Sequence, residues 1–292
     1  MKTIFVGPNG IRAGWRFGIF VFLLFGFSKF FFWTLTSIFH YQEPDGWFAK
    51  SLALEGALSF AAALLAGWIL SKIEGRRFAD YGLALRGAWG RHFFAGVAWG
   101  LGASVVMIVA LSLAGAAKVE GLALHGGELL GSACWWGLAF LLLGFAEEFA
   151  YRGYAQSALG SGMGFWPAAI LLSAMFGATH YFAKPMENWM DAVSVGTFGL
   201  FWCFTLWRTG TLWFAIGFHA MSDYADMVIF AQPNTGNHGQ SLSGHLLNVN
   251  YAGPEWLTGG PRGTEASAVE FVILAALFFV FAKLYPREHG LA

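Results

Sequence analysis

Long apolar runs separated by short polar segments dominate the chain. Runs of bilayer-spanning length, about 20 residues each, occur at 16–38, 52–73, 93–116, 129–151, 166–182, 189–207, 212–230 and 269–284. None of them alternates apolar and polar residues as a membrane β-strand does, and backbone groups inside a bilayer must satisfy their own hydrogen bonds. The pattern therefore predicts an all-α polytopic membrane protein, a bundle of about eight transmembrane helices.

The composition agrees with this prediction. Of the 292 residues, 57% are hydrophobic and 12% are charged, whereas an average soluble domain is about 25% charged. Seventeen basic and seventeen acidic residues cancel, so no basic surface indicates a nucleic-acid partner. Membrane lipid is the partner that this composition indicates.

The basic residues between the apolar runs predict the orientation. With a cytoplasmic N-terminus, twelve Lys and Arg residues lie on the inner side and four on the outer side. Positive charge favours the cytoplasmic side of a membrane. We therefore expect a multi-pass membrane protein with both termini in the cytoplasm, as an even number of spans requires.

Ionisable residues inside the predicted helices gather in the second half of the chain. Each costs about 2.5–3.5 kcal/mol on insertion scales and is a candidate for function. The set consists of Glu147, Glu148 and Arg152 in the fourth helix, His180 in the fifth, and His219, Asp223 and Asp226 in the seventh.

The spacing in the fourth helix separates its two glutamates. Glu148 and Arg152 are four residues apart on one helix face, which predicts an ion pair. Glu147 is rotated by about 100° from Glu148, so it cannot take the same position against Arg152. One carboxylate is thus expected to be neutralised and the other to be free for chemistry.

The interval of four residues recurs as Phe176 with His180 and as His219 with Asp223. A carboxylate one helical turn from an imidazole can fix its tautomer and stabilise its protonated form. Three helices can thus bring carboxylates and imidazoles together around a buried, hydrated cavity. We expect hydrolysis by water in this cavity.

Two chemistries fit this inventory. One is general-base activation of water without a cofactor. The other uses one divalent metal ion such as zinc, with Glu147, His180, His219 and Asp223 as the ligands. A third reading is a proton relay in a transporter, although no pair of Gly/Pro-broken spans occurs in matching halves of the chain.

The three motifs, in order and on separate hydrophobic helices, resemble those of a known family. They are Glu147-Glu148-x-x-x-Arg152, Phe176-x-x-x-His180 and His219-x-x-x-Asp223. The resemblance is to the CPBP family of intramembrane proteases, also called Abi, which contains CAAX prenyl endopeptidases and bacteriocin-processing enzymes. It covers residues 129–226, about a third of the chain.

The resemblance implies an intramembrane endopeptidase of the bacterial inner membrane that cleaves a membrane-associated peptide or protein. Its catalytic core would lie in helices four to seven. Glu147 and His180 would activate the water, and His219 and Asp223 would stabilise the oxyanion. The supporting residues would be Glu148, Arg152 and Phe176.

The residue at Asp223 leaves its role open. The family has Asn or Asp there, and an ionised Asp cannot donate a hydrogen bond to an oxyanion. Asp223 would instead orient His219, be protonated or bind a metal ion. The alternative function is that of a non-catalytic relative, which binds or shields a membrane partner as an immunity or scaffold protein does.

The chain is expected to form one integrated membrane domain. Residues 1–126 hold the first three helices and a basic cytoplasmic loop, 127–230 the catalytic core, and 231–292 a turn-rich outer loop and the last helix. If the fourth helix continues to Leu159, Glu147 lies about 18 Å before its end. Meeting His180 then requires a tilt, a kink or a bend near Gly153.

Overall fold

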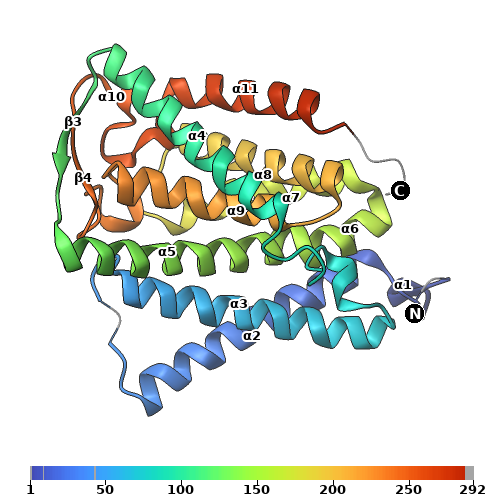
Figure 1. Ribbon diagram of the computed structural model, residues 1–292. Helices are drawn as coiled ribbons and strands as arrows, with labels where there is room; N and C mark the ends of the chain where they lie inside the picture. Colours follow the sequence, from blue (N-terminus) through green and yellow to red (C-terminus); the bar gives the residue numbers. More distant parts are fainter. Residues whose placement is uncertain (1, 9, 43, 287–292) are drawn as a thin grey trace.

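The structure, a computed structural model, describes residues 2–8, 10–42 and 44–286 and is a helical bundle (Figure 1). Its α-helices are α1 (Lys2–Phe5), α2 (Ala13–Ile38), α3 (Ala49–Glu74), α4 (Arg91–Leu113), α5 (Gly126–Glu148), α6 (Gln156–Met163), α7 (Phe165–Ala183), α8 (Trp189–Thr209), α9 (Trp213–Asp223), α10 (Glu255–Thr258) and α11 (Ala268–Leu284).

Short elements complete the fold. The 3₁₀ turns are η1 (Phe78–Tyr81), η4 (Thr235–Asn237), η5 (Gly260–Arg262) and η6 (Thr264–Ala266). Two π-helical segments, η2 (Phe149–Ala155) and η3 (Tyr224–Ile229), continue α5 and α9. The strands are β1 (Val6–Gly7), β2 (Gly10–Ile11), β3 (Ala117–Leu122) and β4 (Leu247–Tyr251).

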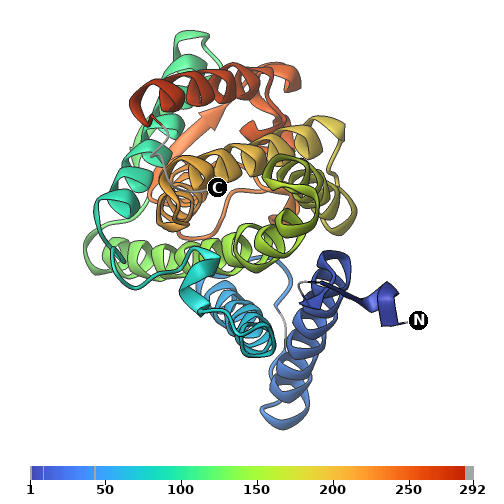
Figure 2. The same ribbon diagram turned by 90° about the vertical axis from the view of Figure 1, so that its right-hand side faces the viewer.

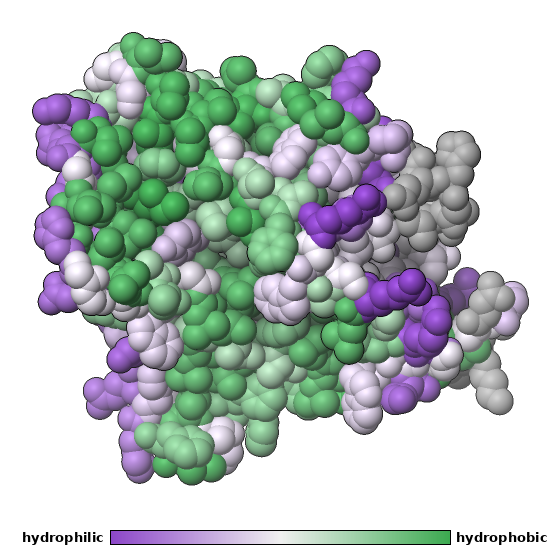
Figure 3. Space-filling model, in the orientation of Figure 1, coloured by the Kyte–Doolittle hydropathy of each residue, from purple (hydrophilic) through white to green (hydrophobic). Residues whose placement is uncertain are grey.

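The polytopic all-α prediction is confirmed. Five of the described helices are long and apolar enough to cross a membrane, at Ala13–Ile38, Ala49–Glu74, Arg91–Leu113, Gly126–Met163 and Trp189–Thr209. The other three predicted spans are also helical, as α7, as α9 continued by η3, and as α11. Figure 3 shows apolar residues across the middle of the molecule and hydrophilic residues at its two ends.

Local sequence signals explain where the membrane helices begin and end. The Asn188 side chain accepts hydrogen bonds from the backbone N–H groups of Met190 and Asp191 and thus caps α8. Gly75 and Gly210 end α3 and α8 with positive φ values of 65° and 68°. A left-handed residue closes the last turn of a helix, and glycine adopts this conformation without strain.

The segment 231–268, which the sequence predicts to be an outer loop and which keeps that name below, is more ordered than its composition predicted. β4 pairs antiparallel with β3, with Ala117 opposite Tyr251 and Leu122 opposite Leu247. This ribbon lies at the end of the bundle opposite α1 (Figure 1). Residues that follow β4 return to the bundle, where the Ser194 hydroxyl donates a 2.6 Å hydrogen bond to the Glu265 carbonyl.

The continuous helix Gly126–Met163 passes through η2, the π-helix that contains Gly153. The sequence left open whether a tilt, a kink or a bend near Gly153 brings Glu147 and His180 together. A π-helical turn holds more residues than an α-helical turn and so changes the face that later residues present. The two side chains line one cavity in the structure.

Small residues bring α4 and α9 into close backbone contact. A Cβ atom on Gly96 would meet the Phe214 carbonyl, one on Gly100 the Phe218 carbonyl, and one on Gly217 the Phe93 carbonyl. Association of membrane helices depends on such close packing because lipid tails are as apolar as the side chains. These contacts hold α9, the helix of His219, against α4.

We therefore expect Gly96→Ala to lower the free energy of unfolding by about 1–3 kcal/mol, as overpacking does. The matched control is Gly102→Ala on the same helix, because no atom lies within 4 Å of its Cβ position. Unfolding in detergent measures both variants. Equal stability of the two would contradict the packing role of Gly96.

Candidate active site

A cavity of about 230 Å³ collects four of the seven ionisable side chains that the sequence singled out. It is lined by Glu147 from α5, His180 from α7, and His219 and Asp223 from α9. All four predicted catalytic residues therefore lie in one place. Apolar side chains, among them Trp202, line much of the remaining wall.

Glu148 lies behind this wall and joins two helices. Its Oε1 accepts a hydrogen bond from Arg152 Nη1 at 3.1 Å, and both side chains are fully buried, which confirms the predicted ion pair. The same Oε1 lies 2.8 Å from His219 Nδ1. The predicted pairing with Arg152 is thus present, and α9 adds a contact that the spacing did not indicate by bringing His219 against the same oxygen.

Aromatic rings and a glycine hold Arg152 in position. Its guanidinium carbon lies 4.4 Å from the centre of the Phe176 ring and 5.1 Å from that of Trp202. A Cβ atom on Gly199 would meet Arg152 Nη2. Cation–π contact strengthens when water is excluded. The Phe176 ring is therefore placed to stabilise the guanidinium group of Arg152, in line with the supporting role that the resemblance implies for Phe176.

His219 is fixed on three sides. Its ring stacks on Trp202 with centroids 4.1 Å apart and an angle of 10°. Glu148 Oε1 contacts Nδ1. The other ring nitrogen, Nε2, faces the cavity, where it lies 3.6 Å from Glu147 Oε2 and 3.5 Å from Asp223 Oδ2. The predicted contact with Asp223 is present, but the shorter contact that orients the imidazole is with Glu148.

His180 has a defined tautomer when neutral. Its Nδ1 lies 2.9 Å from the Phe176 carbonyl oxygen, which can only accept, so Nδ1 must donate. Nε2 then carries the lone pair of the neutral ring. The ring also packs against Phe176, with centroids 4.5 Å apart.

The structure adds residues to the cavity that the motifs did not indicate. Lys184, four residues after His180, lies at the end of α7, and Glu265 comes from the outer loop. Lys184 Nζ lies 4.0 Å from Glu187 Oε1. The interval of four residues after His180 could have indicated Lys184, whereas no local sequence pattern indicates that Glu265 lines the cavity. Burial is the main cause that raises the pKa of the Glu265 carboxyl to about 8.

Among the described residues, no group of three or more His, Cys, Asp and Glu side chains has the arrangement needed to hold a metal ion. The proposed ligands Glu147, His180, His219 and Asp223 share the cavity. Glu148 contacts His219 Nδ1 and leaves Nε2 facing the cavity, an arrangement that histidines also have when they bind a metal ion. The donor set therefore does not decide between the two chemistries.

The raised pKa predicts a pH dependence. Between the usual carboxyl value of 4.5 and about 8, the folded protein keeps a proton on Glu265 that the unfolded chain releases, so stability falls as pH rises. We expect Glu265→Gln to raise the Tm by a few degrees at pH 8 and to have little effect near pH 4.5. Above pH 8 the difference should stay constant.

Thermal unfolding in detergent across this pH range measures the effect. Glu120→Gln, which removes an exposed carboxylate of β3, is the control. A Tm difference for Glu265→Gln that does not grow between pH 4.5 and 8 would contradict the assigned burial of this carboxyl.

Comparisons with known proteins agree with the geometry. The family model described as type II CAAX prenyl endopeptidase Rce1-like matches residues 129–225, which include all three motifs up to Asp223. No curated protein and no solved structure matches the chain. Residues 129–225 are therefore similar to the Rce1-like type II CAAX prenyl endopeptidase family of membrane proteases, which agrees with the resemblance of the motifs.

Proposed function

We propose that the chain is an intramembrane endopeptidase that hydrolyses a peptide bond of a membrane-associated protein. The observation that carries the proposal is that Glu147, His180, His219 and Asp223 line the same cavity. A general base, a neutral imidazole with a defined acceptor nitrogen and a second imidazole held by a carboxylate are together sufficient for the hydrolysis of an amide.

In the first step, Glu147 removes a proton from a water molecule whose second hydrogen bonds to His180 Nε2. The water oxygen forms a bond to the carbonyl carbon of the substrate, and the carbonyl oxygen becomes an oxyanion. The fixed Nδ1–H donation of His180 to the Phe176 carbonyl supports this role, because it leaves Nε2 as the acceptor. Positioned general bases contribute about 10²–10⁴-fold to rate.

In the second step, His219 in its doubly protonated form donates from Nε2 to the oxyanion. Two carboxylates support that form, Glu148 at Nδ1 and Asp223 near Nε2, while Glu147 holds the proton taken from the water. Asp223 orients His219 in this scheme and need not donate to the oxyanion. The C–N bond then breaks, and the proton taken up by Glu147 passes to the leaving amine.

The location and organisation of the protein follow from the same proposal. Residues 127–230 form the catalytic core within one integrated membrane domain, preceded by the helices of 1–126 and followed by the outer loop and last helix of 231–292. Both termini lie in the cytoplasm of a bacterial cell, as the excess of basic residues on one side of the membrane supports.

Cleavage of a defined peptide tests the proposal. The description of the matched family makes a farnesylated peptide that ends in a CAAX sequence the first substrate to use. We expect Glu147→Gln and His180→Ala each to lower kcat/KM by at least about 100-fold, because each removes a group that handles the proton of the water. Release of the C-terminal tripeptide by detergent-solubilised protein is the measurement.

Two matched controls remove the same residue types outside the cavity. Glu120→Gln changes an exposed position of β3, and His238→Ala changes an exposed histidine of the outer loop. Both should retain full activity, and activity should persist in the presence of a metal chelator. Unchanged cleavage by Glu147→Gln would overturn the assigned base, and a loss of activity on chelation that zinc restores would replace the water-activation scheme.

A further inference from the structure

Helix α2 packs less closely than the other membrane helices. Only 6% of its most apolar segment is buried inside the bundle, compared with 33% to 50% for the other four candidate spans. Its one buried residue is Phe20. Figures 1 and 2 show the helix diverging from α3 toward its C-terminal end. Much of its surface is therefore available for contact within the membrane.

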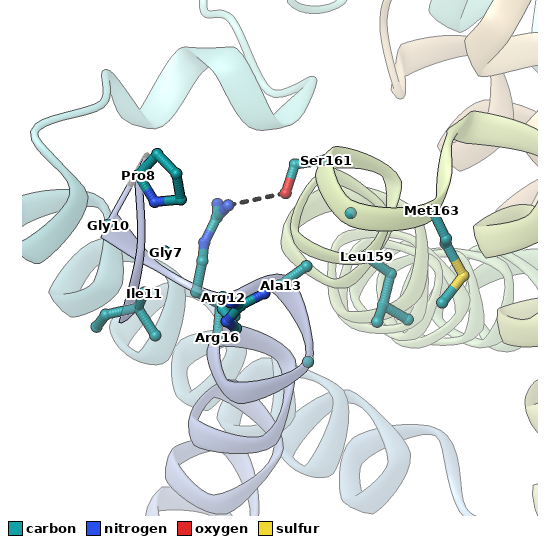
Figure 4. Close-up of a pocket in the computed structure, with 12 residues that line it drawn as sticks. Gly7, Pro8, Gly10, Ile11, Arg12, Ala13, Arg16, Leu159, Ser161 and Met163 are labelled. Atoms are coloured by element: carbon teal, nitrogen blue, oxygen red, sulfur yellow. Dashed lines mark hydrogen bonds between the residues drawn. The ribbon is translucent and has the colours of Figure 1, made fainter. Parts of the chain in front are cut away.

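Polar contacts fasten α2 near its N-terminal end. Arg16 donates from Nε and Nη2 to the two carboxylate oxygens of Glu74 on α3, at 2.8 and 2.5 Å, and from Nη1 to Ser161 on α6 at 3.0 Å. Figure 4 shows this end of the helix beside α6 and the β1–β2 hairpin. Beyond Arg16, the described residues of α2 make no such hydrogen bonds with α6. The C-terminal half of α2, which diverges from α3, can therefore pack against another helix.

One face of that half has an unusual combination of residues. At 100° per residue, Gly18, Phe22, Phe25 and Gly26 all lie within about 60° of Lys29 around the helix. Phe22 and Phe25 are 76% and 63% exposed. No atom lies within 4 Å of the Cβ positions of the two glycines. We call these five residues the Lys29 face.

Lys29 is the feature that points to a partner. Along the helix axis it lies about 14 Å from Ile38 and about 24 Å from Ala13, given a rise of 1.5 Å per residue. It is exposed, and no described residue forms an ion pair or hydrogen bond with it. A lysine at this position in a helix that crosses a hydrocarbon layer of about 30 Å is costly unless its ammonium group reaches the interface or meets an opposite charge.

We propose that the Lys29 face binds a transmembrane helix of a partner protein that carries an Asp or Glu at the depth of Lys29. The opposite charge would satisfy the ammonium, and Gly18 and Gly26 would allow the two backbones to approach closely. A second copy of the chain is disfavoured on this face, because two-fold pairing would bring two Lys29 ammonium groups together. The inference does not depend on the proteolytic function.

The test uses the full-length protein in vesicles of zwitterionic lipid with synthetic transmembrane helices. Three helices of leucine and alanine differ only in a central Glu, Gln or Lys. We expect the Glu helix to bind about fivefold more tightly than the Gln helix, as measured by energy transfer between labels, and the Lys helix to bind more weakly than either. Lys29→Met should remove the preference for Glu.

Gly26→Leu provides a second variant that keeps the charge. It should weaken binding of the Glu helix by blocking close approach, whereas Gly102→Leu on α4 should not. The Tm of each variant shows whether it folds. Equal binding of the Glu and Gln helices by the folded wild-type protein would overturn the proposal.

Two further outcomes would assign Lys29 to another partner and so overturn the proposal. One is preferential binding of anionic lipid that requires Lys29, without a preference for the Glu helix. The other is energy transfer between two copies of the chain that Lys29→Met abolishes. Unaltered peptide cleavage by Lys29→Met would separate this inference from the proposed proteolytic function.

Discussion

The buried carboxylate of Glu148 is the constraint on which the rest of the site depends. One oxygen contacts Arg152 on its own helix and His219 on α9, and all three side chains are buried. A charge in this environment must be paired, because its desolvation is otherwise strongly unfavourable. The pairing fixes the rotation of α9 against α5 and aims His219 Nε2 at Glu147 and Asp223.

Other parts of the fold make this pairing geometrically available. The glycines of α4 let α9 approach closely enough to place His219, and Trp202 and Phe176 exclude water from the rear of the site. One π-helix begins at Phe149 within the first motif, directly after Glu148, and the other begins at Tyr224, directly after Asp223. Such irregular turns occur frequently at functional sites, because they change the direction of the side chains that follow.

Contacts within one helix could be predicted from the sequence, whereas contacts between helices could not. The interval of four residues was sufficient for the Glu148–Arg152 pair and for the proximity of His219 and Asp223. The Glu148–His219 contact depends on how two helices rotate against each other, which no spacing within either helix specifies.

The distinction between local and long-range contacts also explains which features of the cavity and of the membrane helices could be predicted. Glu265 reaches the cavity because the outer loop folds back onto α8, a long-range contact with no periodic signal. Hydropathy located all eight predicted helices. The positions of Glu147 and His180 indicated a tilt, a kink or a bend near Gly153 but not a π-helix, since that depends on packing.

A double-mutant cycle between Glu148 and His219 tests the central claim most directly. The free energy of unfolding in detergent would be measured for the wild-type protein, Glu148→Gln, His219→Gln and the double variant. Direct contact across a buried interface predicts a coupling of about 1 kcal/mol or more. Effects that add to within about 0.3 kcal/mol would contradict the account, because Glu148 would then not join the two helices.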